Sequence, residues 1–134
     1  MNTIVRIQAP NGQGVYQNDL GYEVIGQYQS VRSNPRLPKP NEDGGLVQVA
    51  PHLFCESGWN GWLGTEYIFG FKDVEQLLKW FNFNDKLFEK LDVLNFEIVL
   101  LEGEVFHGTA QSITKKETAK TLKRAKVLEF LSNA

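Results

Sequence analysis

Hydrophobic and polar positions follow two different periods along this chain, and the change between them is clearest across residues 66–83. Residues 66–71 are β-branched and aromatic and end around Gly70, which predicts a strand. Apolar residues then recur with helical spacing at Val74, Leu77, Leu78 and Phe81. Asp73 is placed as the N-cap, with Gln76 at the reciprocal position of a capping box. We therefore predict a strand followed at once by an amphipathic helix.

Four further segments carry strand patterns. Residues 3–8 are rich in β-branched side chains and alternate in polarity, and residues 46–50 alternate over a shorter length. Residues 95–101 are apolar on both faces, which predicts a strand at the centre of its sheet. Residues 105–114 are expected to form one more strand after the break at Gly103.

The remaining segments divide into helices and a loop. Residues 85–91 predict a second short helix, and a capping box over 114–117 predicts a C-terminal helix from about 115 to 131. Residues 16–28 fit a helical or an irregular conformation equally well. Residues 33–45 contain three prolines and predict a loop, because proline fixes φ and removes a backbone donor. A loop of this length is usually functional or disordered.

This order of elements predicts an α+β fold: a single compact domain over residues 1–134, with a mainly antiparallel sheet and two or three helices, the last one C-terminal and basic. Apolar residues make up 42% of the 134, as in a soluble globular protein. No run approaches the roughly 20 apolar residues of a membrane span, and no signal-peptide pattern opens the chain. Cys55 stands alone, which favours a reducing compartment, and we expect the cytoplasm.

The charge is unevenly distributed, although the net charge is only −2. Residues 1–114 hold 8 basic and 14 acidic side chains, whereas residues 115–134 hold 6 basic and 2 acidic ones. Such a basic segment can bind nucleic acid, or it can form a solvated face that pairs with the acidic body. The second interpretation is the more common one, and we expect nucleic acid to be an unlikely partner.

No motif of specific chemistry is complete. His52, Cys55 and His107 do not form the two close ligand pairs of a typical zinc site, so no metal is expected. Cys55 and His107 lack a residue placed to orient a catalytic histidine. The glycines of residues 11–14 resemble a phosphate-binding loop but lack its lysine, and they predict a turn instead.

Several residues of types that are common at protein surfaces and interfaces are candidates for binding a partner. Trp59 and Trp62 flank a glycine turn, where they either anchor an interface or fill the core. The candidates outside this turn are charged, namely Glu42, Asp43, Lys116, Lys120, Lys123 and Arg124. Arg6 lies within the first strand and is either solvent-facing or part of a polar site, because a buried arginine is costly unless it is paired. Of the two positions, we expect the solvent-facing one.

The chain resembles a group of small proteins encoded by bacteriophages and prophages. The block Gly-Phe-x-x-x-Glu-Gln-Leu-x-x-Trp-Phe carries the resemblance, and residues 70–81 match it. A Gly-x-Gly-x-Tyr turn at 12–16, a proline-rich segment at 38–44 and a glycine-to-glutamine segment at 108–111 follow the same order. The basic segment near the C-terminus has no counterpart in this pattern.

The same order is loosely similar to a minimal ADP-ribosyltransferase domain. That resemblance implies that Arg6 would hold the phosphate or ribose of NAD and that Gln111 would occupy the late-strand position of the catalytic glutamate. Glutamine has no charge with which to stabilise an oxocarbenium-like transition state, which counts against catalysis.

The phage resemblance implies an accessory protein that binds a host protein stoichiometrically and inhibits it, for example a component of a defence system such as CRISPR. No cofactor is expected under this interpretation. The alternative is an enzyme that uses NAD to modify a host protein. A third possibility is a nucleic-acid binder led by the basic segment, whose affinity would fall steeply with salt.

Overall fold

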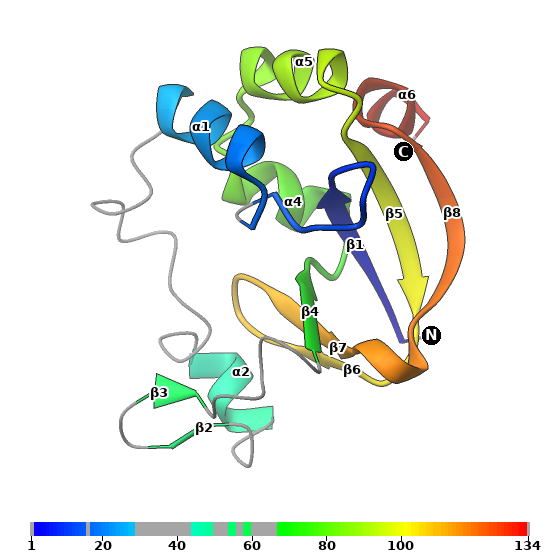
Figure 1. Ribbon diagram of the computed structural model, residues 1–134. Helices are drawn as coiled ribbons and strands as arrows, with labels where there is room; N and C mark the ends of the chain where they lie inside the picture. The colour runs from blue at the N-terminus through cyan, green and yellow to red at the C-terminus, as the bar shows by residue number, and fades with distance from the viewer. Residues whose placement is uncertain are drawn as a thin grey trace.

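The computed structural model describes residues 2–15, 17–28, 44–49, 54–55, 58–59 and 67–133. The expected α+β class is confirmed, since helices accompany two three-stranded sheets and all their strand pairs are antiparallel. The expected C-terminal helix is also present, although it is shorter than predicted. Figure 1 shows the helices gathered around the upper part of the larger sheet, with the second sheet below; they are α1 (Asp19–Tyr28), α4 (Val74–Trp80), α5 (Asp85–Val93) and α6 (Val127–Ser132).

The larger sheet has the strand order β1-β5-β8. Strand β1 (Thr3–Gln8) pairs with β5 (Glu97–Glu102) without a break, from Thr3 opposite Glu102 to Gln8 opposite Glu97. Strand β8 (Lys120–Lys126) pairs with the other side of β5. The prediction that the apolar segment 95–101 lies centrally in its sheet is therefore confirmed.

The smaller sheet has the order β4-β7-β6. Strand β4 (Tyr67–Gly70) lies where it was expected, and it pairs with β7 (Ser112–Lys115). The prediction of one strand over 105–114 was wrong, because the chain turns after β6 (Val105–His107) and returns as β7. Gly108 donates to the carbonyl of Gln111 at 2.8 Å and closes this turn.

The helices begin where side chains satisfy their free amide groups. Helix α4 (Val74–Trp80) is capped by Asp73, whose carboxylate accepts from the Gln76 amide at 2.8 Å. The Gln76 side chain in turn accepts from the amide of Lys72 at 2.9 Å, one residue before the cap. Helix α5 (Asp85–Val93) is capped by Asn84 in the same way. Helix α1 (Asp19–Tyr28) settles the segment that the sequence left open.

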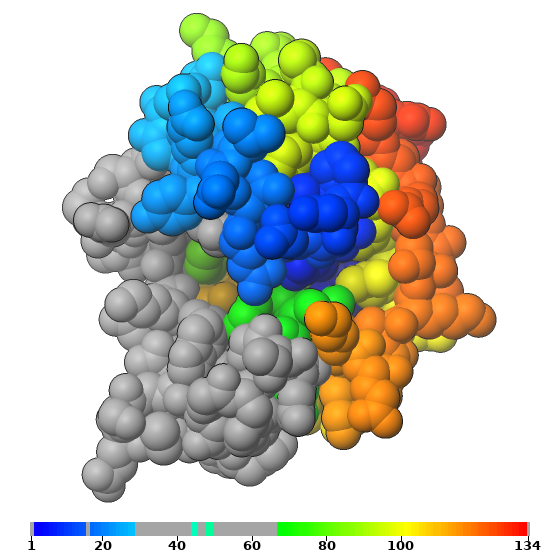
Figure 2. Space-filling view, viewed as in Figure 1, coloured from blue at the N-terminus to red at the C-terminus, as the bar shows by residue number. Residues whose placement is uncertain are grey.

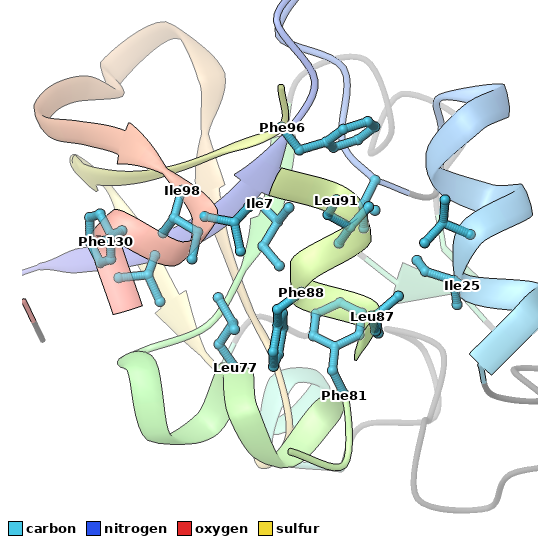
Figure 3. Packing of buried hydrophobic residues seen from close by; sticks show 14 of the residues in the cluster. Ile7, Ile25, Leu77, Phe81, Leu87, Phe88, Leu91, Phe96, Ile98 and Phe130 are labelled. Carbon is cyan, nitrogen blue, oxygen red and sulfur yellow. The ribbon is translucent and has the colours of Figure 1, made fainter. Parts of the chain in front are cut away.

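The main core lies between these helices and one face of the larger sheet. Ile7 and Ile98 extend from the sheet toward the side chains of α4 and α5, as Figure 3 shows. Phe81 connects the two helices through edge-on ring contacts with Phe71 at 6.0 Å and Phe88 at 5.9 Å between centroids. Helix α6 (Val127–Ser132) closes one end with Val127 and Phe130. The aromatic block of residues 67–83 therefore belongs to the scaffold.

The two sheets meet at a single backbone pair. The Val5 amide donates to the Phe71 carbonyl at 2.7 Å, and the Phe71 amide donates to the Val5 carbonyl at 2.8 Å. A second apolar cluster, formed by Ile4, Val99 and Leu101 with Ile68 and Val105, fills the space beside this junction. Gly70 permits the approach, because a Cβ there would lie 2.5 Å from the Val5 carbonyl oxygen.

Two segments have a different secondary structure from the one predicted. The predicted helix over 115–131 was wrong in extent, since a 3-10 turn (Lys116–Thr118), strand β8 and then α6 occupy it. Thr114 cannot cap a helix there, because it is buried in β7 and donates to the Glu104 carbonyl at 2.8 Å. The predicted strand over 46–50 was also wrong, since α2 (Gly44–Val49) is helical. Five alternating residues are too few to separate the two periods.

We expect Gly70→Ala to destabilise the fold by roughly 1–3 kcal/mol, because the added methyl group forces β1 and β4 apart. Urea denaturation followed by circular dichroism measures this change. The matched control is Gly26→Ala in α1, where a Cβ meets nothing within 4 Å. That substitution should raise stability by about 0.5–1 kcal/mol. Equal effects at the two glycines would contradict the junction described above.

Candidate functional site

Arg6 is buried, so the prediction that it faces solvent was wrong. Its side chain lies beneath the turn that follows β1, with only 5% of the residue exposed. The guanidinium donates to the Phe69 carbonyl at 2.9 Å, to the Gly12 carbonyl at 3.3 Å and to the Gln8 side chain at 3.3 Å. Burial lowers the pKa of Arg6 to about 10, because the charged form loses its water. The three acceptors offset part of that cost.

The glycine turn after β1 is built around Arg6. The Gly12 amide donates to the Ala9 carbonyl at 2.9 Å, and Gly12 then adopts a φ of +89°, which favours glycine. A Cβ on Gly14 would lie 3.1 Å from the guanidinium. The glycine pattern and Arg6 are thus parts of one structural unit, which explains the turn without a phosphate ligand.

A line of polar side chains connects Arg6 to the far strand of the sheet. Gln8 accepts from Arg6 and donates to the Glu97 carboxylate at 3.1 Å. Arg124 on β8 then donates to the same carboxylate through its Nε, at 3.2 Å, and through its Nη2. This network spans all three strands of the larger sheet. Arg6 has no ion-pair partner among the described residues, and Gln8 connects it to the negatively charged Glu97.

The structure gives the NAD alternative little geometric support. The described hydrogen bonds of Arg6 all go to protein acceptors, and none goes to Gln111. Gln111 is buried at the end of the β6–β7 turn, directly before β7, rather than on a strand. An arginine that binds a dinucleotide phosphate must present free N–H groups to it. Arg6 uses three of its five N–H groups inside the fold, and only 5% of the residue is exposed.

Among the described residues, His107 and Ser112 form the pair that most resembles a catalytic base beside a nucleophile. Their Nδ1 and Oγ atoms are 2.8 Å apart across β6 and β7. The pKa of His107 is lowered, mainly by burial and then by Lys72, while Asp73 opposes this shift. Ser112, however, has no exposed surface. A catalytic nucleophile must reach its substrate, and the buried Ser112 hydroxyl cannot. The contact with His107 therefore satisfies the Ser112 hydroxyl group inside the fold.

The part of the chain that the structure describes contains no arrangement of side chains suited to metal binding or to cysteine catalysis. No three of its His, Cys, Asp or Glu side chains converge as metal ligands. Cys55 lies in β2 (Phe54–Cys55), whose backbone pairs with β3 (Gly58–Trp59). His52 lies outside the described residues. No described helix is both long and apolar enough for a bilayer crossing.

The basic residues occupy an outer strand. Lys120, Lys123, Arg124 and Lys126 are exposed on β8, and Lys116 is exposed in the preceding 3-10 turn. We call Lys116 together with β8 the basic edge. It runs along the right-hand side of the molecule, as Figures 1 and 2 show. Four of the seven β8 residues are basic and none is acidic.

The two halves of the basic edge differ in their partners. Toward the C-terminal end, Arg124 pairs with Glu97, and Lys126 pairs with Asp92 at 3.6 Å. The Lys123 ammonium lies 4.9 Å from the centre of the Phe130 ring. Lys116 and Lys120 have no ion-pair partner among the described residues, and no ion pair joins Lys120 to its cross-strand neighbour Glu102. Unpaired charge is therefore concentrated at the N-terminal end.

Leu122 is a feature of this surface that the sequence analysis missed. The register of β8 against β5 shifts between Leu100 and Leu101, and Leu122 is the extra residue, with no partner in the ladder. It is 42% exposed, between Thr121 and Lys123. The sequence predicted a helix from about 115 to 131, and a bulge that exposes Leu122 on a strand could not be expected from that prediction.

The other predicted partner-binding residues are not placed. Glu42, Asp43 and Trp62 lie outside the described residues. Trp59 is described only by its backbone, which pairs with Phe54 in the short β2–β3 ladder. Of the predicted binding residues, the structure thus brings together Lys116, Lys120, Lys123 and Arg124.

We expect Arg6→Ala to lower the free energy of unfolding by roughly 2–4 kcal/mol, because it leaves a cavity and removes the donors to two carbonyl groups. Arg6→Met keeps most of the volume and should lose less. The control Lys86→Ala, on the exposed face of α5, should stay within about 0.5 kcal/mol of wild type. Chemical denaturation measures all three variants, and an Arg6→Ala protein of wild-type stability would refute the structural role.

We expect His107 to make stability fall as the pH is lowered through its ordinary pKa of 6.5. The pKa of His107 in the folded protein lies below that value. As the pH falls, the unfolded chain therefore binds the proton first, which stabilises the unfolded state relative to the folded state. The effect should be modest because part of His107 is exposed to water, which screens its charge. Denaturation midpoints at about pH 5.5 and about pH 7.5 measure it. The difference between them should shrink in His107→Gln, and an unchanged difference would contradict this assignment.

Comparison with known proteins adds a family to this geometry. No curated protein and no solved structure matches the chain. Residues 1–128 match the family described as Bacteriophage T4 Y00F protein, so the match includes the basic edge as well as the aromatic block. The resemblance to phage-encoded proteins is confirmed at the level of a family, while the ADP-ribosyltransferase likeness stays a prediction. Because the match covers nearly its whole length, the chain belongs to the Bacteriophage T4 Y00F protein family.

Proposed function

We propose that this protein is a phage accessory protein that binds a host protein in a stoichiometric complex and inhibits it, using the basic edge. The observation that carries the proposal is the unpaired, exposed charge of Lys116 and Lys120 beside the exposed Leu122. Proteins of host defence, such as those of CRISPR systems, are the first targets to test.

The distribution of polar chemistry supports a binding role over a catalytic one. Arg6, Gln76, Ser112 and Thr114 are all buried and hydrogen-bonded inside the fold. Each of these groups satisfies backbone or side-chain partners and so stabilises the structure. On the surface, the cations of the basic edge form an exposed group of one charge sign along a single strand.

The composition of the basic edge suits a protein surface of opposite charge. Complementary charge steers association and discriminates among partners, while an apolar residue adds contact area. Arg124 and Lys126 are held in place by Glu97 and Asp92, so part of the surface is ordered before a partner arrives. Ordered side chains lose less entropy on binding.

Nucleic acid fits this surface less well. A nucleic-acid groove needs a continuous row of cations facing the phosphates. Here Glu97 and Asp92 neutralise two of the cations, and Glu102 lies across from Lys120. The acidic body, with 14 acidic and 8 basic residues over 1–114, would repel a longer strand.

The test is affinity capture from bacterial host lysate, followed by reconstitution of the captured protein with the purified chain in a calorimeter. We expect a one-to-one complex. The double variant Lys116→Glu/Lys120→Glu should weaken it by roughly tenfold or more, since it reverses two interface charges.

The matched control is Lys86→Glu/Lys90→Glu on helix α5, which makes the same change in net charge at exposed positions away from β8. This variant should bind as wild type does. If both double variants lose affinity equally, net charge rather than the basic edge determines binding, and the proposal fails. Absence of any stoichiometric partner would also overturn it.

A further inference from the structure

We infer that the basic edge takes up an acidic, extended segment of its partner by strand addition, so that the segment becomes a fourth strand beside β8. This inference rests on the proposed function and names the mode of binding. In this mode the backbone of the edge strand supplies the hydrogen bonds, and side chains alternating along the added strand determine specificity.

The position of β8 in the sheet provides the backbone groups. Strand order β1-β5-β8 leaves one side of β8 without a strand among the described residues. In an antiparallel ladder, alternate residues of an outer strand direct their N–H and C=O groups away from the sheet. Strand β8 is seven residues long and exposed along almost its full length, so several such groups are available.

The other outer strands of the described sheets are less open. Strand β1 is joined to Phe71 by the two hydrogen bonds of Val5, and the same pair occupies the end of β4. Strand β6 has only three residues, and α2 packs beside it. Gly45 of α2 donates to the Thr109 hydroxyl at 3.2 Å at the tip of the β6–β7 turn. Among the described strands, β8 is therefore the long outer strand with an open side.

Charge decides which occupant fits this strand. A second copy of the chain would bring Lys120, Lys123 and Arg124 against the same residues, and like charges facing each other across a ladder are destabilising. Lysines on an outer strand protect it from self-association for that reason. An acidic strand meets the opposite condition, because its carboxylates face unpaired ammonium groups. The charge that excludes a second copy thus selects an acidic partner.

The bulge at Leu122 gives the added strand a defined place. A bulge sharpens the local twist and interrupts pairing, so an incoming segment is expected to follow the ladder on one side of it. On the side of Lys120 the cations are unpaired, whereas on the side of Arg124 they are already engaged. Leu122, standing between them, offers an apolar contact for an uncharged side chain of the segment.

The test uses a synthetic peptide of alternating glutamate and valine as the probe. The control peptide has the same charge, but proline replaces every second valine, so that it cannot complete a ladder. Isotope-labelled protein is observed by NMR, with amide hydrogen exchange measured along β8. We expect the first peptide to bind, to slow exchange at outward-facing β8 amides by roughly tenfold or more, and to bind far more tightly than the control peptide.

Two protein variants separate charge from backbone. Lys116→Glu/Lys120→Glu should weaken peptide binding by roughly tenfold or more, while Lys86→Glu/Lys90→Glu should leave it unchanged. Leu122→Pro removes a backbone donor at the bulge, outside the ladder with β5, and should reduce binding while the thermal midpoint confirms folding. If Leu122→Pro fails to fold, the charge variants and the exchange pattern still decide the question.

Equal binding of both peptides would overturn strand addition, since charge alone would then suffice. Protection confined to residues outside β8 would overturn it as well. Tighter binding of a mixed-sequence DNA duplex than of the acidic peptide, with a steep dependence on salt, would replace the protein partner with nucleic acid. A host protein that binds the basic edge without protecting β8 amides would remove this inference and leave the proposed function intact.

Discussion

The backbone pair between Val5 and Phe71 is the contact on which the rest of the arrangement depends. It joins the two sheets at one point, and it forms only because Gly70 has no side chain to hold the strands apart. Arg6 binds the Phe69 carbonyl at the same junction and carries the charge network toward β8. The aromatic side chain of Phe71 then enters the core against Phe81. One contact therefore links the small sheet, the large sheet and the helical layer.

Buried and exposed polar groups serve different purposes in this molecule. The buried ones, such as Arg6 and Ser112, cost desolvation energy and are retained because they satisfy backbone and hydroxyl groups at places where layers meet. The exposed cations of β8 satisfy only a few internal partners. The proposed binding role rests on these exposed cations, while the buried polar groups belong to the scaffold.

Local patterns predicted the structure well where the deciding interactions are local. Asp73 caps α4 as expected, because the amide that it accepts from is only three residues away. The apolar character of residues 95–101 likewise indicated a central strand, since both faces of β5 are covered. Arg6 was misjudged because its acceptors include Phe69, which is 63 positions away in the sequence. The sequence pattern alone could not show that the Phe69 carbonyl group would lie within hydrogen-bond distance of the Arg6 side chain.

The C-terminal segment shows most directly what the sequence by itself determined and what tertiary structure decided. The sequence determined its composition, a run of cations with Leu122 among them, and it indicated a helix near the end of the segment. It did not determine that residues 120–126 form a strand, because helix and strand patterns over this segment are both imperfect. Pairing with β5 decided that, since the unsatisfied ladder groups of a central strand require a neighbour on each side. The same long-range pairing places these cations on an outer strand, one side of which has no neighbouring strand among the described residues, instead of on the predicted solvated helix face.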